Sequence, residues 1–130
     1  MFRDPQINLY VRDAEASAHF YRDQFGFVET FRTPRQRAPI HVELQLGAFT
    51  LGVATVDSLR ETHGVIAGAG PSAELVFWAE DVDAAHRTLQ AAGVRTLSAP
   101  HEFLDGALRA TWVADPDGHP IQIVSRRATS

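Results

Sequence analysis

Several short runs of the sequence place polar or aromatic side chains at every second position, where a β-strand directs them all to one face. The residues at such positions are Gln6, Asn8, Tyr10, His41, Glu43, Glu74, Trp78, Trp112 and Gln122. Tryptophan and tyrosine rings offer flat surfaces that stack on planar or cationic ligands. Imidazole, carboxylate and carboxamide groups can orient such a ligand, and some of them can also bind a metal ion. The set therefore predicts a small-molecule site, provided that the fold brings these strands together.

Some of these residues also have a purely structural interpretation. Trp78 and Trp112 could fill a core or a subunit interface instead of lining a cleft. Spacing alone does not make His41 and Glu43 a catalytic pair, because residues two apart share a strand face whether or not they interact.

Arg109 completes the candidate ligand-binding residues. It opens the strand-like run that carries Trp112, so it reaches a cleft only if that strand turns its other face inward or its end twists, and a solvated surface arginine is the commoner outcome. With the arginine-containing loop at residues 32–37 it would bring positive charge to the rim of the cleft. We expect His119, which follows a turn glycine, to be exposed to solvent.

Composition excludes several classes of protein. The 130-residue chain is 45% hydrophobic and 22% charged, as is typical of a globular domain. It has neither cysteine nor lysine, which excludes disulfides, thiolate metal sites, cysteine nucleophiles and Schiff-base lysines. A net charge of −4 and a pI near 5.8 offer no broad positive surface for nucleic acid. No apolar run reaches the ~20 residues of a membrane helix, and the first residues lack a signal-peptide core, so we expect a cytoplasmic protein.

The chain contains an internal repeat. Residues 6–13 align with residues 74–81, and both stretches alternate apolar and polar side chains as a half-buried strand does. Asp13 and Asp81 end these stretches, and each aspartate can cap a following helix, predicted over residues 13–26 and 81–93.

Each predicted helix is followed by further strand-like runs. These are residues 27–31, 41–46 and 49–55 in the first half and 94–97, 108–114 and 120–125 in the second half. The order β-α-β-β-β therefore occurs twice, in a first module of about residues 4–56 and a second of about residues 73–125. Glycine-rich residues 57–72 read as a linker, and residues 100–107, which include His101, read as a loop.

The repeat and its motifs resemble the vicinal oxygen chelate superfamily, which includes glyoxalase I, extradiol dioxygenases, fosfomycin-modifying enzymes and bleomycin-resistance proteins. The motifs are ASAHFYRDQFGF at residues 16–27, EDVDAA at residues 80–85 and DPDGHPIQI at residues 115–123. The resemblance implies an α+β fold in which two βαβββ modules form a half-barrel sheet around a cleft, within one domain spanning residues 1–130. It also implies a homodimer, and it leaves open whether the cleft lies within one chain or between two.

The resemblance further implies where a metal would bind. Metal-using members take ligands from the first and last strands of each module, at positions that correspond to Gln6, Gly52, Glu74 and Gln122. An extradiol Fe(II) site needs two histidines, and none of these residues is a histidine. Two amides and one carboxylate make a weak cage for Zn, Ni or Mn, and a glutamine cannot shuttle a proton. We therefore favour no metal cofactor; a divalent metal, if bound, would use Gln6, Glu74 and Gln122.

Two functions follow from this interpretation. The favoured one is a metal-free protein that binds a drug or metabolite in an aromatic-lined cleft, similar to the bleomycin-resistance branch, because Gly52 and Gln122 replace carboxylate ligands. The alternative is a divalent-metal-dependent lyase or isomerase resembling glyoxalase I, in which Gln6 and Glu74 bind the metal and Glu43 or water supplies a missing ligand. The sequence does not identify the ligand.

Overall fold

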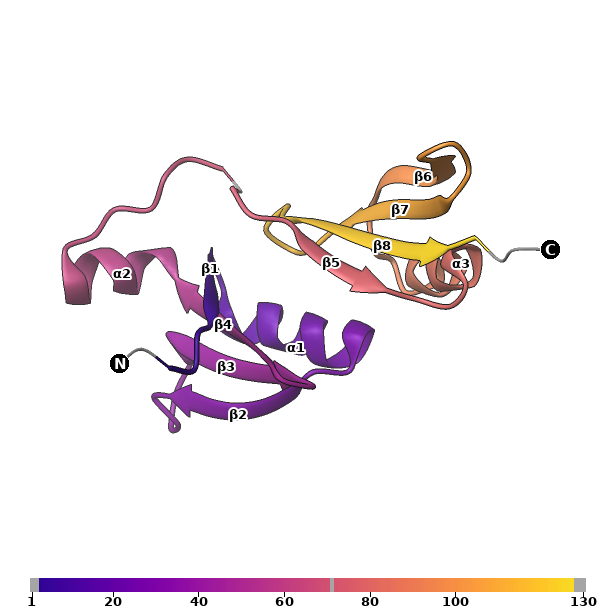
Figure 1. The fold of residues 1–130 in the computed structure, drawn as a ribbon. Coiled ribbons are helices and arrows are strands. Elements are labelled where there is room, and N and C mark those ends of the chain that lie inside the picture. The colour runs from indigo at the N-terminus through magenta and orange to yellow at the C-terminus, as the bar shows by residue number, and fades with distance from the viewer. Residues whose placement is uncertain (1–2, 71, 128–130) are drawn as a thin grey trace. The chain divides into compact units, whose positions relative to one another are not determined.

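Each half of the chain folds into a four-stranded mixed sheet with one helix packed on it, and the α+β class and the βαβββ repeat are confirmed (Figure 1). The structure is a computed structural model that describes residues 3–70 and 72–127. Contacts divide the chain into a first unit, residues 1–69, and a second unit, residues 70–130. Each unit is described by itself below.

The first unit contains the four strands and one helix of the repeat, followed by one additional helix. These are β1 (Ile7–Val11), α1 (Ala14–Phe25), β2 (Val28–Thr33), β3 (His41–Leu46), β4 (Phe49–Thr55) and α2 (Val56–His63). The strand order is β1-β4-β3-β2, with β1 parallel to β4 and the other neighbours antiparallel. Alternate residues of the strands are buried on the face that α1 covers, namely Leu9, Val11, Val42, Leu44, Leu51 and Val53.

Helix α1 begins and ends where its sequence predicts. Asp13 accepts a hydrogen bond from the Ala16 amide at 3.0 Å, which satisfies one of the unpaired donors of the first turn. At the other end Gly26 adopts a left-handed φ of 78°, and its amide donates to the Arg22 carbonyl oxygen at 3.1 Å.

The second unit repeats this plan without the additional helix. It consists of β5 (Leu75–Trp78), α3 (Val82–Ala91), β6 (Thr96–Phe103), β7 (Leu108–Ala114) and β8 (Pro120–Arg126), in the strand order β5-β8-β7-β6. Asp81 caps α3 by accepting from the Ala84 amide at 3.0 Å, as Asp13 does for α1.

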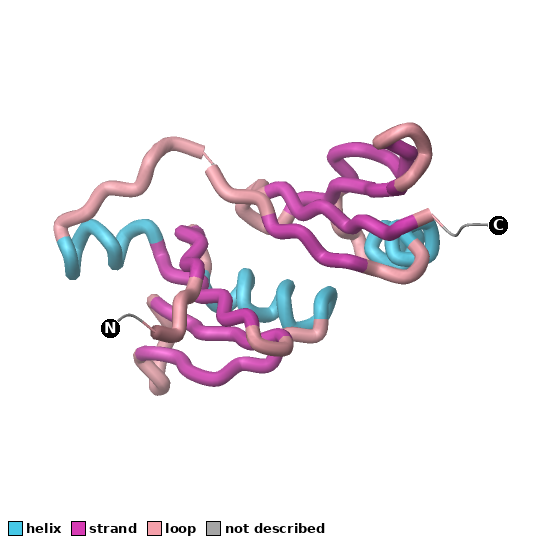
Figure 2. Tube along the Cα trace, viewed as in Figure 1, coloured by secondary structure: helices cyan, strands magenta, loops and turns pink. Residues whose placement is uncertain are grey.

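Two segments differ from their predicted structure. The glycine-rich segment at residues 57–72 contains most of α2, which Thr55 caps and which buries Leu59, so the helix belongs to the first unit (Figure 2). Residue 71 of this segment lies outside the described residues. Strand β6 continues through the predicted loop as far as Phe103, because register shifts let it keep pairing with β7 beyond Ser98.

Within residues 3–70 and 72–127, no helix combines the length and the apolar character needed to cross a membrane.

Candidate functional site

On the first unit, the sheet face opposite α1 gathers four of the predicted site residues. Asn8 and Glu43 both pair with Gly52 across β1, β4 and β3, and Tyr10 and His41 both pair with Ala54 one row further along. The residues that alternate with these are buried beneath α1, so the side chains of the two rows share the other face.

Gly52 determines how closely these side chains approach the sheet. A Cβ atom at this position would lie 3.0 Å from Asn8 Cγ, closer still to Asn8 Oδ1, and 3.4 Å from His41 Cε1. The absence of a side chain at residue 52 therefore gives the Asn8 carboxamide the space that it occupies, with the His41 ring beside it. Gln6 Nε2 donates a hydrogen bond to Asn8 Oδ1 at 2.9 Å.

His41 and Glu43 contact each other directly. His41 Nε2 lies 3.1 Å from Glu43 Oε2, and the two side chains are 23% and 30% exposed. The Phe31 ring meets the His41 ring edge-on at a centroid distance of 6.3 Å. The structure thus brings together two residues that their spacing alone did not identify as a pair.

On the second unit, the corresponding face carries both tryptophans. Val76, Gln122 and Trp112 form one row across β5, β8 and β7, and Trp78, Val124 and Ala110 form the next row. The indole N–H of Trp112 donates to Glu74 Oε1 at 2.6 Å, which is a short, charge-assisted hydrogen bond. Glu74 and Trp112, 38 residues apart in the sequence, therefore act as one hydrogen-bonded group.

Three further side chains join this aromatic face, and the sequence interpretation did not include them as site residues. The His101 ring stacks on Trp112 with a centroid distance of 5.7 Å and an interplanar angle of 14°, and Phe103 contacts both rings. The guanidinium of Arg126 lies 5.2 Å from the centre of the Trp78 ring, within the range of a cation–π interaction. Two of the three, His101 and Phe103, lie in the part of β6 that the sequence analysis read as a loop.

Arg109, predicted as a ligand-binding residue, does not lie on the face that carries Trp112. Its Nε and Nη2 atoms each donate to the Asp83 carboxylate of α3 at 2.8 Å, on the side of the sheet that the helix covers. This two-point contact lowers the pKa of Asp83 and raises that of Arg109. Arg109 and Trp112 are three residues apart on β7, so their side chains point to opposite faces of the sheet.

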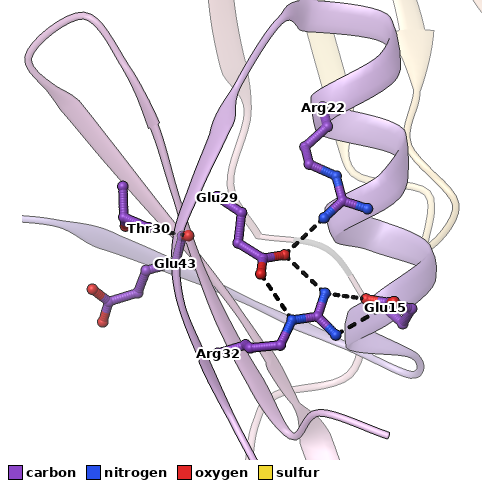
Figure 3. A network of polar contacts seen from close by, with 6 residues as sticks. All are labelled: Glu15, Arg22, Glu29, Thr30, Arg32 and Glu43. Atoms are coloured by element: carbon purple, nitrogen blue, oxygen red, sulfur yellow. Dashed lines mark hydrogen bonds and ion pairs between the residues drawn. The ribbon is translucent and has the colours of Figure 1, made fainter. Parts of the chain in front are cut away.

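Arg32, the first arginine of the predicted rim, is also bound within the unit. Figure 3 shows it between Glu29 and Glu15, while Glu43 points away from this network. His119, predicted to be exposed, is buried, and its Nδ1 atom bonds to Asp115 Oδ2 at 2.8 Å. That hydrogen bond raises the pKa of His119 against the opposing effect of burial.

The residues at the four metal-ligand positions do not fit a transition metal. Gly52 has no side-chain donor atom, Gln6 and Gln122 offer neutral amides, and one oxygen of Glu74 already accepts the Trp112 N–H. Among the described residues, no three histidine, aspartate or glutamate side chains are grouped as a metal site would require.

Comparison with known proteins agrees with this fold. A family model described as Glyoxalase/Bleomycin resistance protein/Dioxygenase superfamily matches residues 5–123. The uncharacterized protein YraH of Bacillus subtilis (strain 168) is 29% identical in an alignment 128 residues long, and the match covers 91% of this chain and 94% of that protein.

Solved structures extend the comparison. The crystal structure of a glyoxalase-related enzyme from Fulvimarina pelagi is 30% identical with a TM-score of 0.76, over 96% of this chain and 89% of that chain. That of a lactoylglutathione lyase from Agrobacterium tumefaciens is 22% identical with a TM-score of 0.72, over 93% and 92% of the two chains, and shows a shared fold. With the family model covering both repeats and their site-bearing strands, the chain belongs to the glyoxalase/bleomycin resistance protein/dioxygenase superfamily.

Proposed function

We propose that this protein binds a small planar molecule against the aromatic face of its second unit, without a metal ion. The observation that carries this proposal is the hydrogen bond from the Trp112 indole to Glu74. Glu74 stands where metal-using relatives place a ligand, and here its carboxylate orients an aromatic ring instead. Because the ring is fixed at its N–H, it offers a preorganised plane at little cost in side-chain entropy.

The neighbours of Trp112 indicate the class of ligand. His101 already stacks on the indole, so a planar ring is accommodated there, and Arg126 over Trp78 indicates that a cationic group is also tolerated on this face. Gln122, paired in register between Val76 and Trp112, adds an amide that can donate to or accept from a polar substituent. A planar drug or metabolite with a few polar groups fits these side chains, and stoichiometric capture of it would suit a relative of the bleomycin-resistance proteins.

The test uses the tryptophans themselves. Both tryptophans of the chain lie in the second unit, so intrinsic fluorescence reports directly on the proposed site. Planar aromatic compounds should quench this fluorescence saturably in the presence of EDTA, and Trp112→Ala should weaken binding at least tenfold, whereas Trp112→Phe, which keeps a ring, should weaken it less. Binding that requires an added divalent metal would contradict the proposal.

The alternative is a metal-dependent lyase or isomerase, in which Gln6 and Glu74 bind a divalent ion. A Gln122→Glu variant distinguishes the two functions, because it restores the carboxylate that this alternative lacks. A large gain in bound Zn or Ni would favour the enzyme; no gain would show that the site is more than one ligand short of a metal centre.

We also propose that the protein acts in the cytoplasm as a homodimer. A chain without cysteine needs no oxidising compartment, which is compatible with the location, and the use of paired modules in the superfamily supports the dimer. Light scattering of the purified chain tests the oligomeric state: a mass near 14.3 kDa would contradict a dimer, since that is the mass of one chain.

A further inference from the structure

Arg126 brings a positive charge without an acidic partner to the aromatic face of the second unit. Its guanidinium carbon lies 5.2 Å from the centre of the Trp78 ring, and Trp78 is 59% exposed. Among residues 3–70 and 72–127, no carboxylate forms an ion pair with Arg126, whereas Arg127, the next residue, is bound to Glu102 at 2.8 Å. The charge of Arg126 is therefore available to a ligand on this face.

The contact with Trp78 also leaves the hydrogen-bonding capacity of Arg126 unused. A cation–π interaction involves the charge of the guanidinium and satisfies none of its N–H donors. The indole restricts where the long arginine side chain lies, so less conformational entropy is lost when a ligand binds to it. Two parallel N–H groups of a guanidinium match the two oxygens of a carboxylate, which makes a bidentate, charge-assisted contact.

The strand register places this cation beside the proposed stacking surface and away from the acidic residue of the same face. Arg126 lies two residues beyond Val124 on β8, and Val124 pairs with Trp78, so Arg126 is one row past the tryptophan. Glu74 precedes Trp78 by four residues, roughly 13 Å along an extended strand, and it is bonded to Trp112. The face is therefore positive near one tryptophan and negative near the other.

We infer that the planar molecule bound on this face is an aromatic carboxylic acid, whose carboxylate pairs with Arg126. The inference rests on the proposed function, because the ring of the acid uses the tryptophan surface described there. Arg126 already supplies the cation of the Trp78 end, so the complementary group on the ligand is an anion. One arginine balances the single charge of a carboxylate, whereas a phosphate monoester carries about −1.5 to −2 at neutral pH and would need a second cation.

Matched acids and amides test the charge of the ligand directly. The probes are benzoate with benzamide, 2-naphthoate with 2-naphthamide, and indole-3-acetate with indole-3-acetamide, each titrated by calorimetry into the wild-type protein at neutral pH with EDTA. The members of a pair share one ring system and differ in the charge of one group. We expect the acid of at least one pair to bind roughly five- to tenfold more tightly than its amide, and added salt should reduce this difference.

Variants of two adjacent arginines assign the preference to one side chain. Arg126→Gln should lower the affinity for the acid to that for the amide, with little change for the amide itself. Arg126→Lys, which keeps the charge but not the planar fork, should retain part of the preference. Arg127→Gln is the matched control, because it removes the same charge one residue away, where Glu102 already binds it, and the preference should be unchanged.

The possible failures are distinguishable. An acid and an amide that bind equally well in every pair, or a preference that Arg126→Gln leaves intact, would overturn the inference and leave the proposed stacking function standing. Binding by no member of any pair would also overturn it, and the fluorescence titration with uncharged planar compounds would decide the proposed function separately. The comparison of acid with amide uses the wild-type protein, so it does not depend on the folding of a variant.

Discussion

At the scale of single residues, we expect a substitution at Gly52 to disturb the packing of a neighbouring side chain without a large effect on stability. Replacing it with alanine places a methyl group on the Asn8 carboxamide oxygen, but that oxygen is the free end of an exposed side chain and can rotate away. We therefore expect Gly52→Ala to change the free energy of unfolding by less than about 1 kcal/mol, since the lower backbone entropy of alanine offsets part of the strain. The Asn8 side-chain amide signals in an NMR spectrum should nevertheless shift strongly.

The control for this prediction is Asn8→Ala, which removes the carboxamide in advance. In that background Gly52→Ala should be neutral or stabilising, because His41 Cε1, 3.4 Å from the new methyl group, lies at an ordinary contact distance. A loss of several kcal/mol in both backgrounds would show that the backbone of β4, not Asn8, requires the glycine.

The buried pair of His119 and Asp115 predicts a pH dependence. Because Asp115 raises the pKa of His119 above its ordinary value of 6.5, the pair stabilises the fold fully below pH 6.5, and this contribution is lost as the pH rises through the folded-state pKa. Asp115→Asn should remove this dependence and cost about 1–3 kcal/mol, since Asp115 also accepts the amides of Asp117 and His119. Urea unfolding across pH 5–9 measures both effects.

The exposed pair of His19 and Asp23 serves as the matched control. It has the same chemistry and the same four-residue spacing, but its side chains are 67% and 52% exposed. Asp23→Asn should change stability by no more than roughly 0.5 kcal/mol, because water screens the interaction. If both variants were equally destabilising, burial would not be the cause of the His119 effect.

The sequence predicted which strand residues share a face, but it did not predict which side chains bond to one another. The alternation of strand residues placed Asn8, His41 and Glu43 on one face correctly, because period two is a property of the strand itself. The orientation of Arg109 was not predicted because its partner, Asp83 of α3, is 26 residues away in the sequence. The burial of His119 was not predicted because it depends on how the turn folds the ring back onto Asp115, four residues earlier.

At the scale of elements, a charged network ties α1 to β2. Arg32 donates to Glu29 at 2.8 Å and to Glu15 at 2.6 Å, and Glu29 also accepts from Arg22 at 2.7 Å (Figure 3). Arg32→Gln should lower stability by about 1 kcal/mol, because an arginine with two partners contributes more than an isolated surface pair. Chemical denaturation at low and high salt measures this loss, which should be smaller at high salt.

Acidification provides an independent check on the same network. Hydrogen bonding from Arg32 lowers the pKa of Glu29, so its contribution to stability is present above its ordinary pKa of 4.5 and is lost as the pH falls through the folded-state pKa. Arg32→Gln should weaken this acid dependence. Arg60→Gln is the control, since Arg60 lies 3.8 Å from an exposed Asp57 and should contribute nothing measurable; a comparable loss there would contradict the account.

Elements were predictable where capping and periodicity agreed. Asp13 and Asp81 fixed the starts of α1 and α3, since an N-cap aspartate acts on its own first turn. Helix α2 was missed because the glycines that follow it dominated the composition of the segment. The extension of β6 was missed because pairing with β7, a long-range contact, sustains the strand through its irregularities.

At the scale of the whole molecule, the internal repeat in the sequence was sufficient to predict the fold. Two copies of the same order of elements, each with a parallel pair of first and last strands, give two equivalent units. The equivalence does not extend to the site-bearing faces, because one carries a histidine–glutamate pair beside amides and the other carries two tryptophans. The two units therefore share a fold but present different side chains on these faces.

The central claim is that this member of the superfamily works without a metal ion. Elemental mass spectrometry of protein purified without an affinity tag or chelator, before and after dialysis against Ni, Zn, Mn and Fe salts, tests it most directly. We expect a stoichiometry close to zero in both samples, because Gly52 supplies no ligand, Gln122 is neutral and Glu74 is bonded to Trp112. Retention of about one metal ion per chain would contradict the account and would support the metal-dependent lyase or isomerase instead.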